Sequence, residues 1–149
     1  MARIPRVRQT YFYRAPPERV FAALTDPKLL PTWFADRATV VLRKGGSFAL
    51  AWGEYTMRGR VRRVVAPERL VVTWVDTTED GRRFETEAQF DLVPKGRGTL
   101  LTITHRGFKK GKRWVALYGA IQSGWAHYLT NLRSVLEHRV DLRSPHNAR

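Results

Sequence analysis

The stretch KRWVALYGAIQSGWAHYLTNLRSVLEHRV, residues 112–140, carries the pattern that decides the fold. Advancing 100° per residue, its apolar side chains fall within about 120° of arc, which predicts one long amphipathic helix. The apolar stripe is too wide and too aromatic for a coiled-coil seam, so the helix needs a concave sheet to lie in. The residues of the stripe are Trp114, Leu117, Tyr118, Ile121, Trp125, Tyr128, Leu129, Leu132, Val135 and Leu136.

Between residues 38 and 106 the apolar pattern changes to a period of two, which is typical of strands with one buried face. Turn residues such as Gly45 and Gly46 separate the runs. Hairpin-length connections then join neighbouring strands, so the sheet is predicted to be antiparallel. The clearest alternation is in ETEAQFDL (residues 85–92), whose inward side chains are Thr86, Ala88, Phe90 and Leu92.

A first strand is predicted at residues 6–14, followed by two short helices whose starts and ends are set by prolines. Asp26 is the expected N-cap of the second helix, and Pro31 prevents its extension. The aromatic pair Trp33 and Phe34 follows directly. We expect this pair to close one end of the fold, near the long helix or the entrance of a cavity.

This order of elements predicts an α+β helix-grip fold. A curved antiparallel sheet of about seven strands surrounds the long C-terminal helix, with two short helices after the first strand. The 149 residues are expected to form a single domain, residues 1–149, with an ordered core from about 7 to 140 and a short basic tail.

The charge of the chain is strongly positive, at +14 with a pI of about 11.2. The basic residues are spread along the chain without a nucleic-acid-binding motif, so a nucleic-acid partner is not expected. Arg58, Arg60 and Arg62 share the outer face of one strand, where carboxylates of residues 84–91 can reach them. With no cysteine, no membrane-spanning run and no signal-peptide core, the chain is expected in the cytoplasm, without disulfides or thiolate metal sites. Its oligomeric state stays open.

Six segments in order resemble one protein family. They are APPERVFAALTDPKLLPTWF (15–34), GGSF (45–48), GRV (59–61), PERLVVTW (67–74), GTLLTITHRGF (98–108) and GWAHYLTNL (124–132). The family is that of the bacterial homologues of the activator of the ninety-kilodalton heat-shock protein ATPase, within the START-like, polyketide-cyclase-like (SRPBCC) superfamily. The resemblance implies a cavity between sheet and helix that takes an apolar ligand. Chaperone stimulation in the eukaryotic activator depends heavily on a separate N-terminal domain; nothing precedes the START-like domain in this sequence, so that activity is not expected.

The predicted inward residues are unusually bulky and carry several polar tips, as the walls of binding pockets do. Small residues among them leave two alternatives open, an interlocked core or a void. His105 is the best polar candidate for a ligand contact; the alternative is a histidine bonded to a neighbouring backbone carbonyl. The candidate ligand-binding residues are Trp33, Phe34, Trp52, Tyr55, Met57, Trp74, Phe90, His105, Phe108, Trp114 and Tyr118.

No catalytic constellation can be assembled from the sequence, the histidines lack metal-ligand spacing, and no metal or cofactor is expected. The basic stretch HRGFKKGKRW (105–114) either rims the cavity and attracts an anionic group or is simply solvated. We therefore expect a domain that binds a small apolar or amphipathic ligand, with an anionic group as one option, rather than an enzyme. The alternatives are a cyclase- or aromatase-like enzyme and a protein- or nucleic-acid-binding module using the basic surface.

Overall fold

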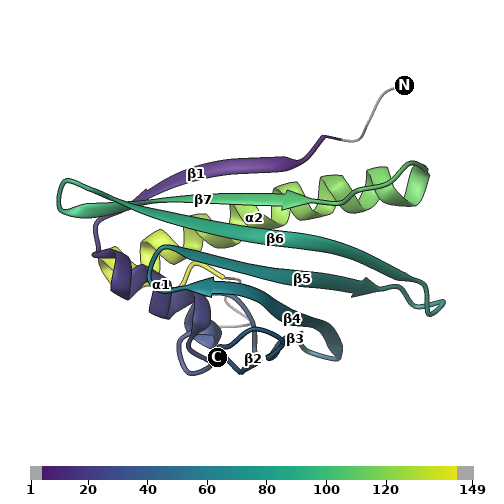
Figure 1. Cartoon of the computed structure of the whole chain (residues 1–149), viewed down its shortest axis with the longest axis horizontal. Helices are drawn as coiled ribbons and strands as arrows, with labels where there is room; N and C mark the ends of the chain where they lie inside the picture. The colour runs from purple at the N-terminus through teal and green to yellow at the C-terminus, as the bar shows by residue number, and fades with distance from the viewer. Residues whose placement is uncertain (1–4, 144–149) are drawn as a thin grey trace.

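The computed structural model describes residues 5–143, so the end of the predicted basic tail lies outside the described residues. All seven strands form one antiparallel sheet in the order β1-β7-β6-β5-β4-β3-β2, with α2 lying along it (Figure 1). The predicted helix-grip fold is confirmed. The elements are β1 (Val7–Tyr13), α1 (Pro17–Thr25), η1 (Leu30–Thr32), β2 (Arg37–Val40), β3 (Ser47–Trp52), β4 (Tyr55–Val65), β5 (Arg69–Thr77), β6 (Arg83–Lys95), β7 (Gly98–Arg106) and α2 (Lys112–His138).

The predicted alternation of the strands is confirmed by their burial. Thr86, Ala88, Phe90 and Leu92 of β6 are all buried against the inside of the sheet. The outer face is polar, and there Glu87 forms ion pairs with two arginines. Its Oε2 lies 3.4 Å from Arg62 Nε, and its Oε1 lies 2.8 Å from Arg106 Nη1. Part of the positive charge is therefore paired across strands, as the sequence predicts for Arg62.

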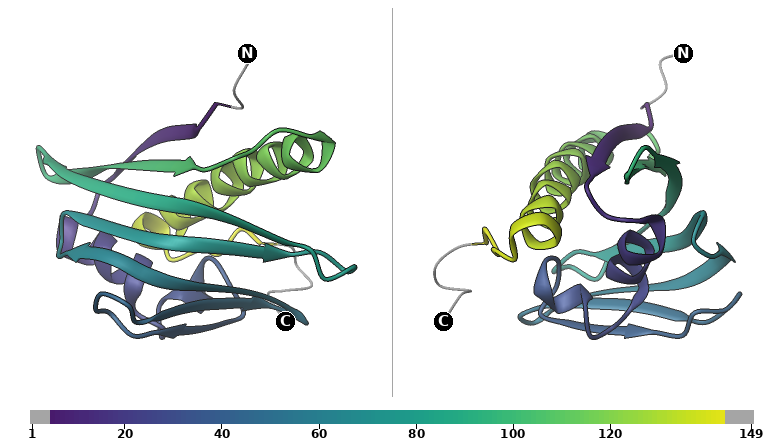
Figure 2. Two further views of the ribbon diagram at one scale, coloured as in Figure 1. Left: turned by 45° about the vertical axis from the view of Figure 1, so that its right-hand side comes forward. Right: turned by 90° about the vertical axis from the view of Figure 1, so that its left-hand side faces the viewer.

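The pairing of β4 with β5 is irregular at one point. The register of the two strands shifts between Val61 and Arg63. Two residues earlier, a Cβ placed on Gly59 would lie 2.0 Å from the carbonyl oxygen of Thr73, so only glycine fits there. Such irregularities increase the twist of a strand, and they help the sheet to curl around the helix, as Figure 2 shows.

The second of the two predicted short helices is much shorter than an α-helix. Asp26 is not the N-cap of the second helix as predicted: it is the C-cap of α1, and its Oδ1 accepts a hydrogen bond from the Lys28 amide at 2.8 Å in the turn that follows. A turn follows, and the only helical piece is the single 3-10 turn η1. Pro31 has no backbone N–H, so it cannot donate the hydrogen bond to the Pro27 carbonyl oxygen that an α-helix would need there.

α2 leans toward β1, which leaves its other side open. The Tyr13 hydroxyl donates to the Leu129 carbonyl oxygen at 2.8 Å, and Gln9 Nε2 donates to the Gln122 carbonyl oxygen at 2.9 Å. The helix ends at His138, two residues earlier than predicted, and its C-cap Arg139 adopts the left-handed conformation with φ 57°. No helix within residues 5–143 is both long and apolar enough to cross a membrane.

Burial along α2 is uneven. The buried positions, Trp125, Leu129, Asn131, Leu132 and Leu136, all fall in its second half. Residues 112–124 are half-buried or exposed. The apolar stripe is therefore fully buried only in the second half of the helix, which α1 also approaches (Figures 1 and 2), and half-buried in the first half, where Trp114 still packs on Phe84 of β6.

Candidate functional site

A pocket of about 310 Å³ lies between β3, β4 and β5 on one side and the middle of α2 on the other. It lies on the side of α2 that faces away from β1. Gly124 opens it further, because a Cβ built on this residue would meet no heavy atom within 4 Å. The lining residues are Phe34, Trp52, Tyr55, Trp74, Asp76, Leu117, Ala120, Ile121, Gly124, Trp125 and Tyr128.

The walls of the pocket are mainly aromatic rings that hold one another in place. The Phe34 ring lies between Trp52, Trp125 and Tyr128, with centroids 5.1, 5.3 and 4.9 Å away. Trp74 packs on Trp125 with a centroid distance of 5.2 Å. Trp52 is fixed further, because its Nε1 donates to the Phe34 carbonyl oxygen at 2.7 Å. The wall is thus formed before any ligand arrives.

Trp33 anchors the segment that carries Phe34. Its side chain is fully buried, and its Nε1 donates to the Ala23 carbonyl oxygen at 2.9 Å. Its own carbonyl oxygen accepts from Asn131 Nδ2 of α2, also at 2.9 Å. Trp33 therefore ties α1 to α2 and places Phe34 against the pocket, so the aromatic pair closes one end of the fold as expected.

The polar end of the pocket is formed by Asp76 and Tyr55. The Tyr55 hydroxyl donates a short hydrogen bond to Asp76 Oδ1. Burial raises the pKa of the Asp76 carboxyl, although the hydrogen bond from Tyr55 lowers it in part. Burial, followed by the hydrogen bond to Asp76 and its charge, raises the pKa of Tyr55 far above its ordinary value.

Asp76 is absent from the site residues predicted from the sequence, yet a signal for it exists. Leu70, Val72 and Trp74 are in phase on the inner face of β5, and Asp76 is the next residue of that phase. The pattern breaks there because a carboxylate follows three apolar residues. An acid that continues an inward phase at the end of a strand is a candidate for a pocket residue.

A second, wider recess of about 600 Å³ adjoins the pocket beneath the start of α2. Asp76 lines both cavities, and Glu79 and Asp80 line the recess only. Arg113 Nη2 spans the recess to Asp80 Oδ2 at 2.8 Å. The hydrogen bond from Arg113 is the main cause that holds the pKa of Asp80 well below its usual value. The basic stretch 105–114 thus contributes Arg113 to the rim, opposite three carboxylates.

His105 lies in the core with both ring nitrogens bonded. Trp125 Nε1 donates to Nδ1 at 3.0 Å, so Nδ1 is the acceptor and Nε2 carries the hydrogen. Nε2 therefore donates to Thr86 Oγ1 at 2.6 Å. The Thr86 hydroxyl in turn donates a hydrogen bond to the Trp74 carbonyl oxygen at 3.2 Å. The partners of His105 are side chains, not the backbone carbonyl considered from the sequence.

This network makes folding sensitive to acid. Burial, with a smaller contribution from the charge of Arg106, lowers the pKa of His105 from 6.5 to about 3. The unfolded chain takes up this proton below its pKa near 6.5 and the folded chain does not, so the contribution is fully present above that pH. We expect the free energy of unfolding to fall by up to about 1.4 kcal/mol for each pH unit below 6.5.

Urea unfolding at pH 7, 6 and 5 tests this expectation, because most carboxylates stay ionised in that range. The variant His105→Gln lacks the titrating group and should show a flatter dependence on pH. Equal slopes for the two proteins would contradict the assignment of His105 as a neutral, buried histidine.

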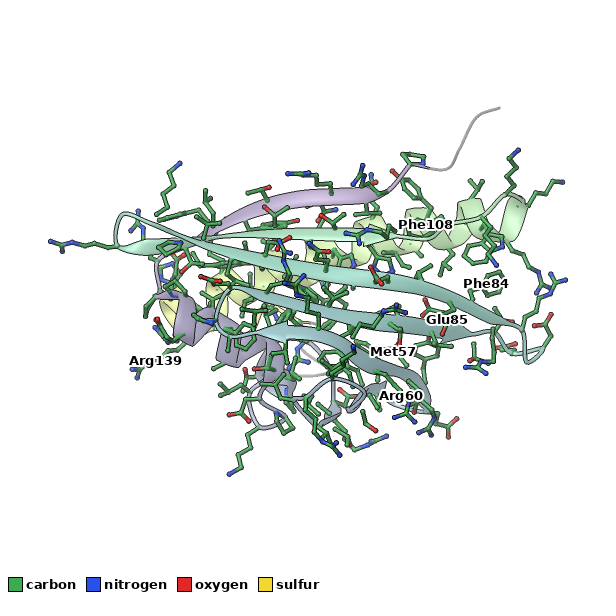
Figure 3. All side chains as sticks on the ribbon, in the orientation of Figure 1. Met57, Arg60, Phe84, Glu85, Phe108 and Arg139 are labelled. Atoms are coloured by element: carbon green, nitrogen blue, oxygen red, sulfur yellow. The ribbon has the colours of Figure 1, made fainter. Side chains whose placement is uncertain are left out.

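The sequence-predicted residues fall into separate groups. Phe34, Trp52, Tyr55 and Trp74 line the pocket. Trp33, Met57, Phe90 and His105 are core residues that do not line it. The last group packs near the start of α2, away from the pocket: Trp114 contacts Phe84, and Tyr118 contacts Phe108. Figure 3 shows Phe84 and Phe108 at this end of the molecule. The pocket residues absent from the candidate list are Asp76, Leu117, Ala120, Ile121, Gly124, Trp125 and Tyr128, although Leu117, Ile121, Trp125 and Tyr128 belong to the apolar stripe predicted for α2.

Comparison with known proteins gives a family and a fold. The family model described as "Activator of Hsp90 ATPase homolog 1-like protein" matches residues 14–137. No curated protein matches the sequence. CalU16 from Micromonospora echinospora is 28% identical with a TM-score of 0.71, over 90% of this chain and 77% of that one. MLL2253 from Mesorhizobium loti is 25% identical with a TM-score of 0.79, and the match covers 93% of this chain and 100% of that one. An HSP90 activator from Plasmodium falciparum, 24% identical over 88% and 95%, shares the fold with a TM-score of 0.73.

Proposed function

Because this chain belongs to the Activator of Hsp90 ATPase homolog 1-like family and has its START-like fold, we propose that it binds a small, ring-bearing apolar molecule. The molecule would occupy the pocket between β3–β5 and α2. One observation carries this proposal: Leu117 and Ile121, apolar residues in the first half of α2, are only half-buried, and they line a pocket between the helix and the sheet.

The physical reason is the exposed apolar surface. A helix that had only a structural role would lie flat on the sheet, since burial of apolar surface contributes about 25 cal/mol per Å². Here Leu117 and Ile121 of α2 face Trp52 and Trp74 of the sheet across the pocket. A flat ring system inserted there would cover both walls at once. Pockets of this kind, apolar with few polar groups, are the usual form of small-molecule sites.

Calorimetric titration with 1-naphthalenemethanol, a neutral two-ring probe, tests the proposal. We expect saturable binding with one molecule per chain and a negative heat-capacity change, which is the mark of apolar burial. The absence of any binding up to the solubility limit of the probe would overturn the proposal.

A second candidate, a cyclase-like enzyme, is favoured by the pair Tyr55 and Asp76. A carboxylate with a raised pKa, bonded to a phenol at the end of an aromatic pocket, can exchange protons with a bound substrate. The replacement Tyr55→Phe keeps the ring and removes the hydroxyl. A binding protein should retain its affinity for the neutral probe within about threefold, whereas a cyclase-like enzyme should lose turnover of a polyketide-type substrate.

A further inference from the structure

The pocket contains a carboxylate whose bonding is incomplete. Asp76 Oδ1 accepts the hydrogen bond from Tyr55, but Asp76 Oδ2 is buried and has no hydrogen-bond partner among residues 5–143. A buried charged oxygen without a donor is costly, and native proteins rarely leave one unexplained. The missing donor is therefore a feature of the site that a ligand can supply.

The rest of the lining determines which kind of donor fits. Among the described residues that line the pocket, Asp76 is the one that carries a carboxyl group, and none is Lys, Arg or His. Two indole N–H groups of the lining are already used, since Trp52 Nε1 donates to Phe34 and Trp125 Nε1 donates to His105. What remains facing the ligand is mainly ring surface, whose negative π faces attract cations.

The charge of the adjoining recess has the same sign as that of Asp76. Glu79 and Asp80 add two carboxylates against the single guanidinium of Arg113. The protein as a whole carries +14, so the lining of the pocket and recess is acidic on a strongly basic molecule, whose cations Arg82, Arg83 and Lys112 line a neighbouring hollow instead. A carboxylate ligand would meet unfavourable charge at close range, where solvent screens it least.

We propose that the pocket takes an organic cation: an apolar, ring-bearing molecule with a protonated amine that binds Asp76. The ring body packs between the tryptophans and α2, and the ammonium donates to Oδ2 of Asp76 within the aromatic walls. This inference rests on the proposed function and adds to it the class of ligand. It replaces the anionic group that the basic stretch 105–114 suggested in the sequence.

Three probes of nearly one shape test the inference: 1-naphthylmethylamine, 1-naphthalenemethanol and 1-naphthoate. We expect the protonated amine to bind about tenfold more tightly than the alcohol, because both can donate to the Asp76 carboxylate but only the ammonium adds a positive charge to the hydrogen bond. The naphthoate should bind most weakly. The titrations are run at physiological ionic strength, so that the overall positive charge is screened.

The variant Asp76→Asn assigns the preference to one side chain. It should bring the affinity for the amine down to that for the alcohol and leave the alcohol within about twofold. The matched control is Glu85→Gln, which removes the same charge from an exposed residue of β6 and should keep the tenfold preference (Figure 3). If Asp76→Asn does not fold, the ratio of amine to alcohol on the unaltered protein decides the matter.

The outcomes separate the two proposals. If no probe binds, the proposed function fails, and this inference fails with it. If all three probes bind without preference for the amine, or if Asp76→Asn keeps that preference, the pocket binds apolar molecules but the cation assignment is overturned.

Discussion

Replacing Gly124 with leucine is expected to weaken the binding of 1-naphthalenemethanol by about tenfold or more, without loss of stability. The side chain would project into the pocket, where a Cβ meets no neighbour within 4 Å. In a helix interior, leucine is favoured over glycine by about 0.7 kcal/mol, so the free energy of unfolding should rise or stay level. Loss of function without loss of stability is the result expected when a substitution fills a binding pocket.

The same helix supplies the control. Gly119 is exposed, and a Cβ built on it also meets nothing within 4 Å, but it does not line the pocket. Gly119→Leu should therefore give a similar gain in stability with the affinity for the probe unchanged within about twofold. Equal losses of affinity in Gly119→Leu and Gly124→Leu, or tight binding by Gly124→Leu, would show that the probe binds elsewhere.

The largest loss of stability is expected from Trp33→Ala. Removing a fully buried tryptophan leaves a cavity that costs about 3–5 kcal/mol, and here the bond from Nε1 to the Ala23 carbonyl oxygen is lost as well. For a chain of this length we expect the melting temperature to fall by about 10 °C. The affinity for the naphthalene probe should also fall, because Trp33 holds the segment that places Phe34 in the wall.

Two variants give this prediction its scale. Trp33→Phe keeps most of the ring and should cost less than half as much. Trp114→Ala removes a tryptophan that is only half-buried and should cost well under 3 kcal/mol. A Trp33→Ala protein as stable as Trp114→Ala would mean that the connection from α1 to α2 does not depend on this side chain.

The fold could be predicted from the sequence because its signals are local. The alternation of Thr86, Ala88, Phe90 and Leu92 defines the inner face of β6 without knowledge of its neighbours. The stripe of α2 likewise follows from a single helix. The second short helix is the exception: it is a single 3-10 turn that starts at Leu30, and its N-cap is Leu29 and not Asp26.

The pocket could be predicted only in part, because its existence depends on contacts between distant segments. The sequence left open whether glycines beside large rings allow interlocking or a void, and the structure gives a different answer for each. Gly59 accommodates the close carbonyl of Thr73, whereas Gly124 faces open space. Gly124 faces open space because hydrogen bonds from Gln9 and Tyr13 hold α2 close to β1. A pattern within one segment of the sequence cannot predict such contacts between distant segments.

The polar chemistry of the site was the least accessible part. His105 was selected as a ligand contact because it continues an inward phase, yet Thr86 and Trp125 use both of its ring nitrogens. Asp76 continues an inward phase in the same way and does reach the pocket. Phase alone shows that a side chain points inward. Whether its polar atoms find partners depends on the neighbouring strand and on α2.

The most direct measurement is a structure of the protein with 1-naphthylmethylamine bound, by crystallography or by intermolecular nuclear Overhauser effects. We predict that the naphthalene ring lies between Trp52, Trp74 and Gly124, with the ammonium nitrogen within hydrogen-bond distance of Asp76. A probe found on the outer face of the sheet, or a pocket closed by Ile121 and Leu117 against the tryptophans with the probe excluded, would contradict the account.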